Sequence, residues 1–103
     1  MRKVRILEEA SQEAIEAASW FESSLPGLGE EFFNSIKKGI DVIEENILPL
    51  SPLPYASNSK VKRLVLDRFP YSIIALETSD EVILVAFAHH SRKPEYWKNR
   101  KLF

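Results

Sequence analysis

The four residues Pro26 to Gly29, PGLG, separate two segments of helical periodicity and constrain the fold of this chain more than any other feature. Proline removes a backbone donor, and glycine tolerates the left-handed conformation found at helix C-termini, so a first helix cannot continue through this tetrapeptide. A connection this short makes the two helices fold back on each other as a hairpin. The hairpin keeps one shared apolar side, which another part of the chain must cover.

The segment before PGLG predicts a helix that begins after Ser11 and ends near Leu25. Serine is favoured at a helix N-cap, and acidic residues follow in the first turn, where the helix dipole stabilises them. Apolar residues recur at helical spacing, which indicates one buried face. These residues are Ala14, Ile15, Ala18, Phe21 and Leu25.

The segment after PGLG has the clearest amphipathic pattern in the chain. Apolar residues follow spacings of three and four, while charged residues fill the opposite face. We therefore expect the glutamates of this helix to be solvated and not paired for acid–base catalysis. The apolar positions are Phe32, Phe33, Ile36, Ile40, Ile43 and Ile47.

A segment rich in proline, Leu48 to Ser59, predicts an irregular loop, and three extended segments follow it. Short polar connections between these segments predict antiparallel pairing of consecutive strands. The last segment is apolar almost throughout and should be the most buried. The three predicted strands are Val61 to Leu66, Tyr71 to Glu77 and Val82 to His90.

A further short strand is predicted at Arg2 to Leu7, so the element order is β-α-α-β-β-β. The simplest arrangement is an α+β fold, with the helical hairpin packed on one face of a mostly antiparallel four-stranded sheet. The chain has 103 residues and 45% hydrophobic content, enough for one core. We expect residues 1–103 to form a single domain.

The absence of cysteine excludes disulfides, thiolate metal clusters and cysteine catalysis. The first ten residues, MRKVRILEEA, combine basic residues with only a short apolar run, unlike a signal peptide, and no apolar stretch reaches membrane-spanning length. We therefore expect a cytoplasmic protein with no membrane partner.

Charge is sorted along the chain, although the net charge is only −1. Acidic residues predominate between Glu8 and Asn46, whereas basic residues predominate from Lys60 to Ser72 and again from Arg92 onward. Convergence of the two basic segments would give the folded molecule one cationic surface. The alternative is that these charges are ordinary solvated faces.

The consecutive histidines His89 and His90 do not predict a metal site. Neighbouring residues on a strand point to opposite faces, and no cysteine or third histidine completes a ligand set. No glycine-rich phosphate loop is present either, so we expect no cofactor. We interpret His89 as a partly buried residue at a strand end, and either imidazole could act as a general acid or base.

Basic and aromatic residues of the second half form the strongest candidate site. If the sheet and the C-terminal tail lie side by side, their cations could bind phosphates and their rings could stack on bases. The alternative is structural: the tail aromatics anchor the C-terminus, and the arginines pair with the acidic helices. The set comprises Arg63, Arg68, Tyr71, Arg92, Lys93, Tyr96, Trp97, Lys98 and Arg100.

Three motifs in this order, WFESSLPGLGEEF, RLVLDRFPYSII and VAFAHHSRKPEYW, resemble the toxins of the RelE/ParE superfamily. These are the toxic halves of bacterial type II toxin–antitoxin systems, also known as plasmid-stabilisation or addiction modules. The resemblance spans nearly the whole chain, and the family's element order is the one predicted above. It implies a cytoplasmic toxin neutralised by a cognate antitoxin that wraps its sheet and helices, with contact to operator DNA only through that antitoxin.

RelE-like members of this superfamily cut messenger RNA on the ribosome without a metal, using strand cations, a late arginine and a tyrosine. Arg63, Arg92 and Tyr96 are the matching positions and are the catalytic candidates if this chain is RelE-like. Val65 and Ser72 stand where a second strand lysine and a strand arginine are expected. Both departures remove positive charge from the scissile phosphate.

ParE-like members lack the full ribonuclease set and are associated with inhibition of DNA gyrase by binding. We favour ParE-like action because of the missing strand charges, with a RelE-like mRNA endoribonuclease as the alternative. A toxin with neither activity, or a non-toxic interaction module whose basic face binds a partner, also fits the pattern. The residues expected to contact the target or the antitoxin are Arg68, Tyr71, His89, Lys93, Trp97 and Arg100.

Overall fold

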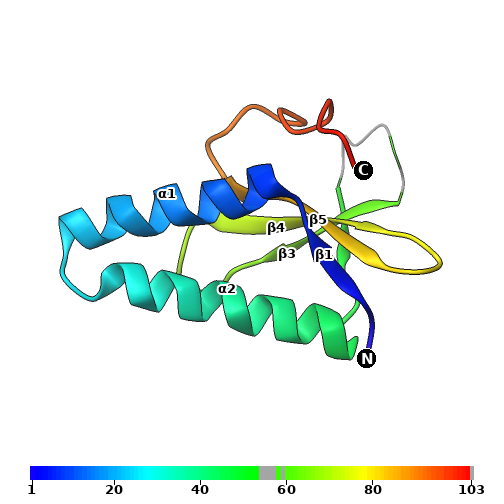
Figure 1. Ribbon diagram of the computed structural model, residues 1–103, viewed down its shortest axis with the longest axis horizontal. Coiled ribbons are helices and arrows are strands. Elements are labelled where there is room, and N and C mark those ends of the chain that lie inside the picture. The colour runs from blue at the N-terminus through cyan, green and yellow to red at the C-terminus, as the bar shows by residue number, and fades with distance from the viewer. Residues whose placement is uncertain (54–57, 59, 103) are drawn as a thin grey trace.

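The chain folds into two helices packed on one mixed β-sheet, seen in a computed structural model that describes residues 1–53, 58 and 60–102 (Figure 1). The predicted α+β architecture and element order are confirmed, with one strand added. In chain order the elements are β1 (Val4–Ile6), α1 (Glu8–Ser24), α2 (Leu28–Glu45), β2 (Ser51–Pro52), β3 (Val61–Val65), β4 (Tyr71–Glu77) and β5 (Val82–His89).

The strand order in the sheet is β1-β5-β4-β3-β2, with β1 parallel to β5 and every other pair antiparallel. Strand β2 is the addition to the four predicted strands, because Ser51 and Pro52 pair with Arg63 and Lys62 within the segment expected to be irregular. An edge strand tolerates proline because one of its sides needs no backbone donor. Residues 54–57 and 59 of the predicted loop lie outside the described residues.

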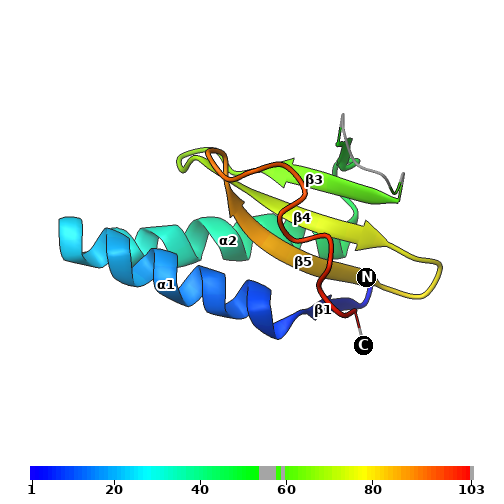
Figure 2. The same ribbon diagram turned by 90° about the horizontal axis from the view of Figure 1, so that it is seen from above.

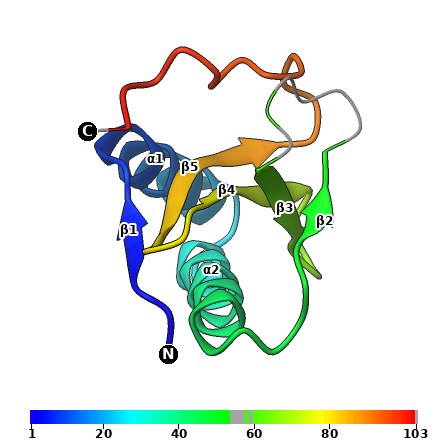
Figure 3. The ribbon, with the colours of Figure 1, turned by 90° about the vertical axis from the view of Figure 1, so that its right-hand side faces the viewer.

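The sheet lies between α2 and the C-terminal segment, and α1 contacts both the sheet and that segment. Helix α1 contacts β5, and α2 packs with Gly39 against Ile73 of β4. Figure 2 shows the segment after β5, coloured orange to red, passing over β4 and β5. Figure 3, viewed end-on, shows the sheet between this segment and α2. The predicted association of sheet and tail is therefore present.

Helix α1 begins at Glu8, earlier than the prediction based on Ser11 as an N-cap. The Ser11 amide instead donates to the Leu7 carbonyl at 3.0 Å, inside the first turn, and the side chain of Leu7 provides no cap. Leu7 and Ala10 are buried, and Glu8 and Glu9 occupy the first turn near the positive end of the helix dipole. The burial of Leu7 and Ala10 and the two glutamates of the first turn thus stabilise the start of this helix without a capping side chain.

Part of the predicted apolar helix surface is exposed, so the buried face predicted from the periodicity is wrong at these positions. Ile15 is 54% exposed, Leu25 57%, Phe33 44% and Ile47 64%. Alanines of α1 form the buried contact instead, and Ile47 follows the end of α2. Small alanines let the elements approach closely, so the larger side chains lie on the outer edge of the hairpin. In the described part of the chain, no helix is both long and apolar enough to cross a membrane.

Aromatic rings join the helical hairpin to the turn between β3 and β4. Phe21 and Phe32 lie on opposite helices with ring centroids 5.1 Å apart, and each lies 5.0–6.1 Å from Phe69 and Tyr71. These contacts attach the hairpin to the β3–β4 turn, with edge-to-face geometry in most pairs. Strand β5 is buried along nearly its whole length, as predicted.

Gly29 is expected to be intolerant of a side chain. A Cβ at this position would lie 2.6 Å from the backbone oxygen of Ala18, which cannot rotate away. We expect Gly29→Ala to lower the free energy of unfolding by about 1–3 kcal/mol, as overpacking does. Urea denaturation measures this change.

Gly39→Ala is the matched control. Its Cβ would lie 2.7 Å from Cδ1 of Ile73, the movable end of a side chain. Alanine also improves helix propensity by about 1 kcal/mol over glycine, so this variant should lose less stability than Gly29→Ala. A Gly29→Ala protein as stable as the parent would contradict the close helix contact.

Candidate functional site

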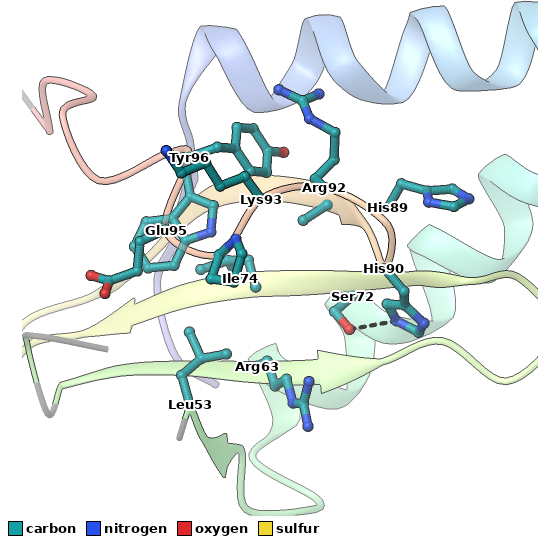
Figure 4. A pocket seen from close by; sticks show the side chains of 13 residues that line it. Leu53, Arg63, Ser72, Ile74, His89, His90, Arg92, Lys93, Glu95 and Tyr96 are labelled. Carbon is teal, nitrogen blue, oxygen red and sulfur yellow. Dashed lines mark hydrogen bonds between the residues drawn. The ribbon is translucent and has the colours of Figure 1, made fainter. Parts of the chain in front are cut away.

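A pocket of about 230 Å³ lies between the sheet and the C-terminal segment (Figure 4). The fold brings together several residues predicted from the sequence, including Arg63, His89, Arg92, Lys93 and Tyr96, with Trp97. The full lining is Leu53, Arg63, Ser72, Ile74, Ala88, His89, His90, Arg92, Lys93, Pro94, Glu95, Tyr96 and Trp97.

Other members of the predicted set lie elsewhere. Arg68 pairs with Glu31 of α2 at 2.7 Å, and Arg100 pairs with Glu13 of α1 at 2.8 Å. Tyr71 packs on the aromatic cluster and contacts the ring of His89, with centroids 5.0 Å apart. Lys98 lines a neighbouring pocket. The structural alternative therefore holds for Arg68 and Arg100, which pair with the acidic helices.

Strand register explains which side chains face the pocket. Arg63 is opposite Ile74, and Val65 is opposite Ser72, so all four side chains share one sheet face. The two positions that lack the expected charges, Val65 and Ser72, are thus on the same face as Arg63. Arg63 is the one cation that this face of β3 and β4 presents in the described part of the chain.

The two histidines have separate partners. The hydroxyl of Ser72, a buried residue, lies 2.9 Å from Nε2 of His90. Nδ1 of His89 accepts a hydrogen bond from the Ser91 amide at 2.9 Å. Strand β5 ends at His89, one residue before the predicted end, because the chain turns there and the Arg92 amide donates to the His89 carbonyl. Among the described residues, no three acidic or histidine side chains gather as metal ligands.

The carboxylate of Glu13 joins α1, β5 and the C-terminal segment. Oε1 accepts from the Phe87 amide at 3.1 Å and from Arg100 at 2.9 Å, and Oε2 accepts from the Tyr96 hydroxyl at 2.5 Å and from Arg100 at 2.8 Å. Arg100 also donates to the Val85 carbonyl at 2.9 Å. We call Glu13, Tyr96 and Arg100 the carboxylate clamp.

The clamp lies next to a β-bulge of β5. Ile74 pairs with Ala86, but the next residue, Ala75, pairs with Leu84, so Val85 of β5 is left over. The clamp satisfies the Val85 carbonyl and the Phe87 amide along the edge of β5, beyond the residues that pair with β1. Sequence reasoning missed Glu13 because nothing local distinguishes it from the solvated glutamates of the first half.

Burial and the carboxylate clamp keep the Tyr96 hydroxyl protonated. Burial raises the pKa of the Tyr96 hydroxyl far above its ordinary value, and the hydrogen bond to Glu13 and the Glu13 charge raise it further. The hydroxyl donates its proton to Oε2 of Glu13, so this proton is engaged by the clamp. The guanidinium of Arg92 lies over the Tyr96 ring, 3.9 Å from its centroid. In this arrangement Tyr96 is a poor proton acceptor and a support for Arg92.

Comparison with solved structures shows a shared fold. No protein-family model matches the sequence, and no curated protein matches it. Among solved structures, a chain from the "Chromosomal ParDE TA system from P. aeruginosa" superposes with a TM-score of 0.71 at 14% identity. The match covers 86% of this chain and 96% of that one, so the two share a fold.

The clamp should be a major source of stability. Glu13 and Arg100 are only 18% and 17% exposed, so Glu13→Gln leaves a mostly buried guanidinium without its counter-charge. We expect a loss of about 2–4 kcal/mol in the free energy of unfolding, approaching the range for broken buried pairs. Denaturant titration measures it.

Glu31→Gln is the matched control, because it breaks the Arg68 pair on the surface. Those side chains are 62% and 45% exposed, and exposed pairs contribute within about 1 kcal/mol. Equal losses for the two variants would show that the clamp stabilises no more than a surface ion pair.

Proposed function

We propose that this chain is the toxin of a type II toxin–antitoxin system and acts in the ParE-like manner, by binding DNA gyrase. The observation that carries the proposal is the shared fold with a chain of a ParDE system, over 86% of this chain. The three sequence motifs support it independently, since they span the helix junction, the β3–β4 turn and the C-terminal segment.

The pocket chemistry favours binding over RNA cleavage. Cleavage of a phosphodiester needs a proton acceptor for the 2′-hydroxyl and positive charge around the phosphorane. Tyr96 is committed to Glu13, and Val65 and Ser72 bring no charge to the face that carries Arg63. Two of the catalytic candidates, Arg63 and Arg92, remain as cations, but the hydroxyl of Tyr96 beside Arg92 is bound to Glu13 and does not accept the proton.

The alternative is a RelE-like mRNA endoribonuclease. It is supported by Arg63, Arg92 and Lys93 at one pocket and by the imidazole of His90 next to the Ser72 hydroxyl. In that case the arginines would neutralise the phosphate, and His90 would replace the tyrosine as proton acceptor.

An exposed groove on the helical hairpin is the surface that we assign to the antitoxin. It lies between α1 and α2, encloses about 430 Å³, and is lined by Ile15, Ala18, Phe33 and the acidic residues Glu22 and Glu30, with Ser19 and Gly29. Ile15 and Phe33 are 54% and 44% exposed. A helical or extended antitoxin segment with apolar residues and flanking lysines or arginines would complement it.

Induced expression of this chain alone should stop bacterial growth. The purified protein should impair gyrase supercoiling and leave messenger RNA intact on translating ribosomes, because Tyr96 is bound to Glu13 and Val65 and Ser72 bring no charge to the pocket face. Supercoiling assays and mapping of mRNA ends measure the two activities.

Two results would count against this function. Codon-specific mRNA cuts that disappear in Arg92→Ala would favour the ribonuclease. Normal growth at high soluble expression would favour a non-toxic interaction module.

The groove assignment predicts variants that escape neutralisation. Ile15→Glu should weaken antitoxin binding by about tenfold or more, because it removes a large apolar contact and adds charge to an acidic rim. Toxicity in the absence of antitoxin should be unchanged. Co-expression rescue and calorimetry with the antitoxin measure both effects.

Ile47→Glu is the matched control, since Ile47 is 64% exposed but lies outside the groove. It should be neutralised like the parent. Equal neutralisation of the Ile15→Glu protein would place the antitoxin elsewhere on the toxin.

A further inference from the structure

Two arginines differ from the others because they form no ion pair with a described carboxylate. Four arginines pair with carboxylates, at distances of 2.5–3.0 Å: Arg2 with Glu77, Arg5 with Glu81, Arg68 with Glu31 and Arg100 with Glu13. Within the described residues, the other two, Arg63 and Arg92, have no carboxylate partner. The residues outside the described part have no acidic side chain. Both unpaired arginines line the same pocket.

The pocket holds these cations ready for an external anion. Nε of Arg63 is buried and finds no hydrogen-bond acceptor among the described residues. Buried donors without an acceptor are rare and destabilising, so an acceptor brought to this guanidinium would be stabilising. Arg92 is held over the Tyr96 ring, which the clamp fixes in turn. Figure 4 shows the carboxylate of Glu95, the acidic lining residue, turned away from both arginines.

The two largest aromatic side chains of the pocket, Trp97 and Tyr96, are already covered. Trp97 is only 7% exposed, and Arg92 covers the ring of Tyr96. Recognition of single-stranded RNA relies on open aromatic faces on which bases stack. The acidic helices and the net charge of −1 also disfavour a long polyanion. The site therefore fits local negative charge on a chain that is otherwise neutral or apolar.

We propose that this pocket binds an acidic peptide segment of a protein partner, with carboxylates on Arg63 and Arg92 and an apolar residue against Leu53, Ile74 and Trp97. The two guanidiniums lie on opposite rims (Figure 4), so an extended segment with spaced carboxylates matches them better than one small anion. Charge-assisted hydrogen bonds to arginine supply the specificity. The inference rests on the proposed function, because a toxin that acts by binding needs such a partner.

The test uses a short fluorescein-labelled peptide of alternating leucine and glutamate with the full chain. A peptide with glutamine in place of glutamate controls for charge, and a labelled oligouridylate of equal length represents RNA. Anisotropy reports binding. In a Trp20→Phe background, Trp97 is the remaining tryptophan, so its fluorescence localises the peptide to the pocket.

We expect the glutamate peptide to bind, to shift the Trp97 emission, and to bind about tenfold more weakly to the Arg63→Gln, Arg92→Gln double variant. Arg68→Gln, which removes an arginine outside the pocket, should bind like the parent. Thermal unfolding confirms that each variant is folded. Equal binding of the glutamine peptide, equal binding by the double variant, or tighter binding of the oligouridylate would overturn the proposal.

Peptide binding and growth arrest are separate measurements. Growth arrest without peptide binding would overturn the pocket inference and leave the toxin function standing. Peptide binding that depends on Arg63 and Arg92 would support the inference even if expression of the chain leaves growth normal.

Discussion

One buried carboxylate, Glu13, connects the three layers of this protein. It accepts four hydrogen bonds, from a β5 amide, from Tyr96 and twice from Arg100. A carboxylate is stable at low exposure only when its lone pairs are satisfied in this way. Glu13 and Arg100 satisfy the Phe87 amide and the Val85 carbonyl at the edge of β5. Glu13 also holds Tyr96, whose ring supports Arg92 at the wall of the pocket. The site is therefore coupled to the core through Glu13.

The arginines divide into those that stabilise the fold through ion pairs and those that remain available to bind a partner. Most arginines fasten elements together, as Arg2 does when it joins the end of α2 to Glu77 of β4. Arg63 and Arg92 remain without such a role and face a common pocket. A protein with nearly balanced charge can thus present concentrated positive charge at one place, because its other cations are neutralised internally.

The molecule offers two surfaces of opposite character. The hairpin groove is apolar with an acidic rim, and the pocket on the other side of the sheet is cationic at its rims. In the function proposed here, the groove receives the antitoxin and the pocket receives an acidic segment of a protein partner. Because the groove and the pocket share no lining residue, substitutions can change neutralisation and target binding independently.

The sequence by itself determined the two helices, the strands other than β2, their order and the pairing of consecutive strands, because helical periodicity, the PGLG break and short polar turns act over a few residues. It also identified Arg63, Arg92 and the tail aromatics as a candidate set. Only the tertiary structure decided which candidates stay unpaired and what Tyr96 does, since Glu13 and Arg100 are 87 positions apart. Contacts at that separation depend on how the layers pack, and no local pattern encodes them.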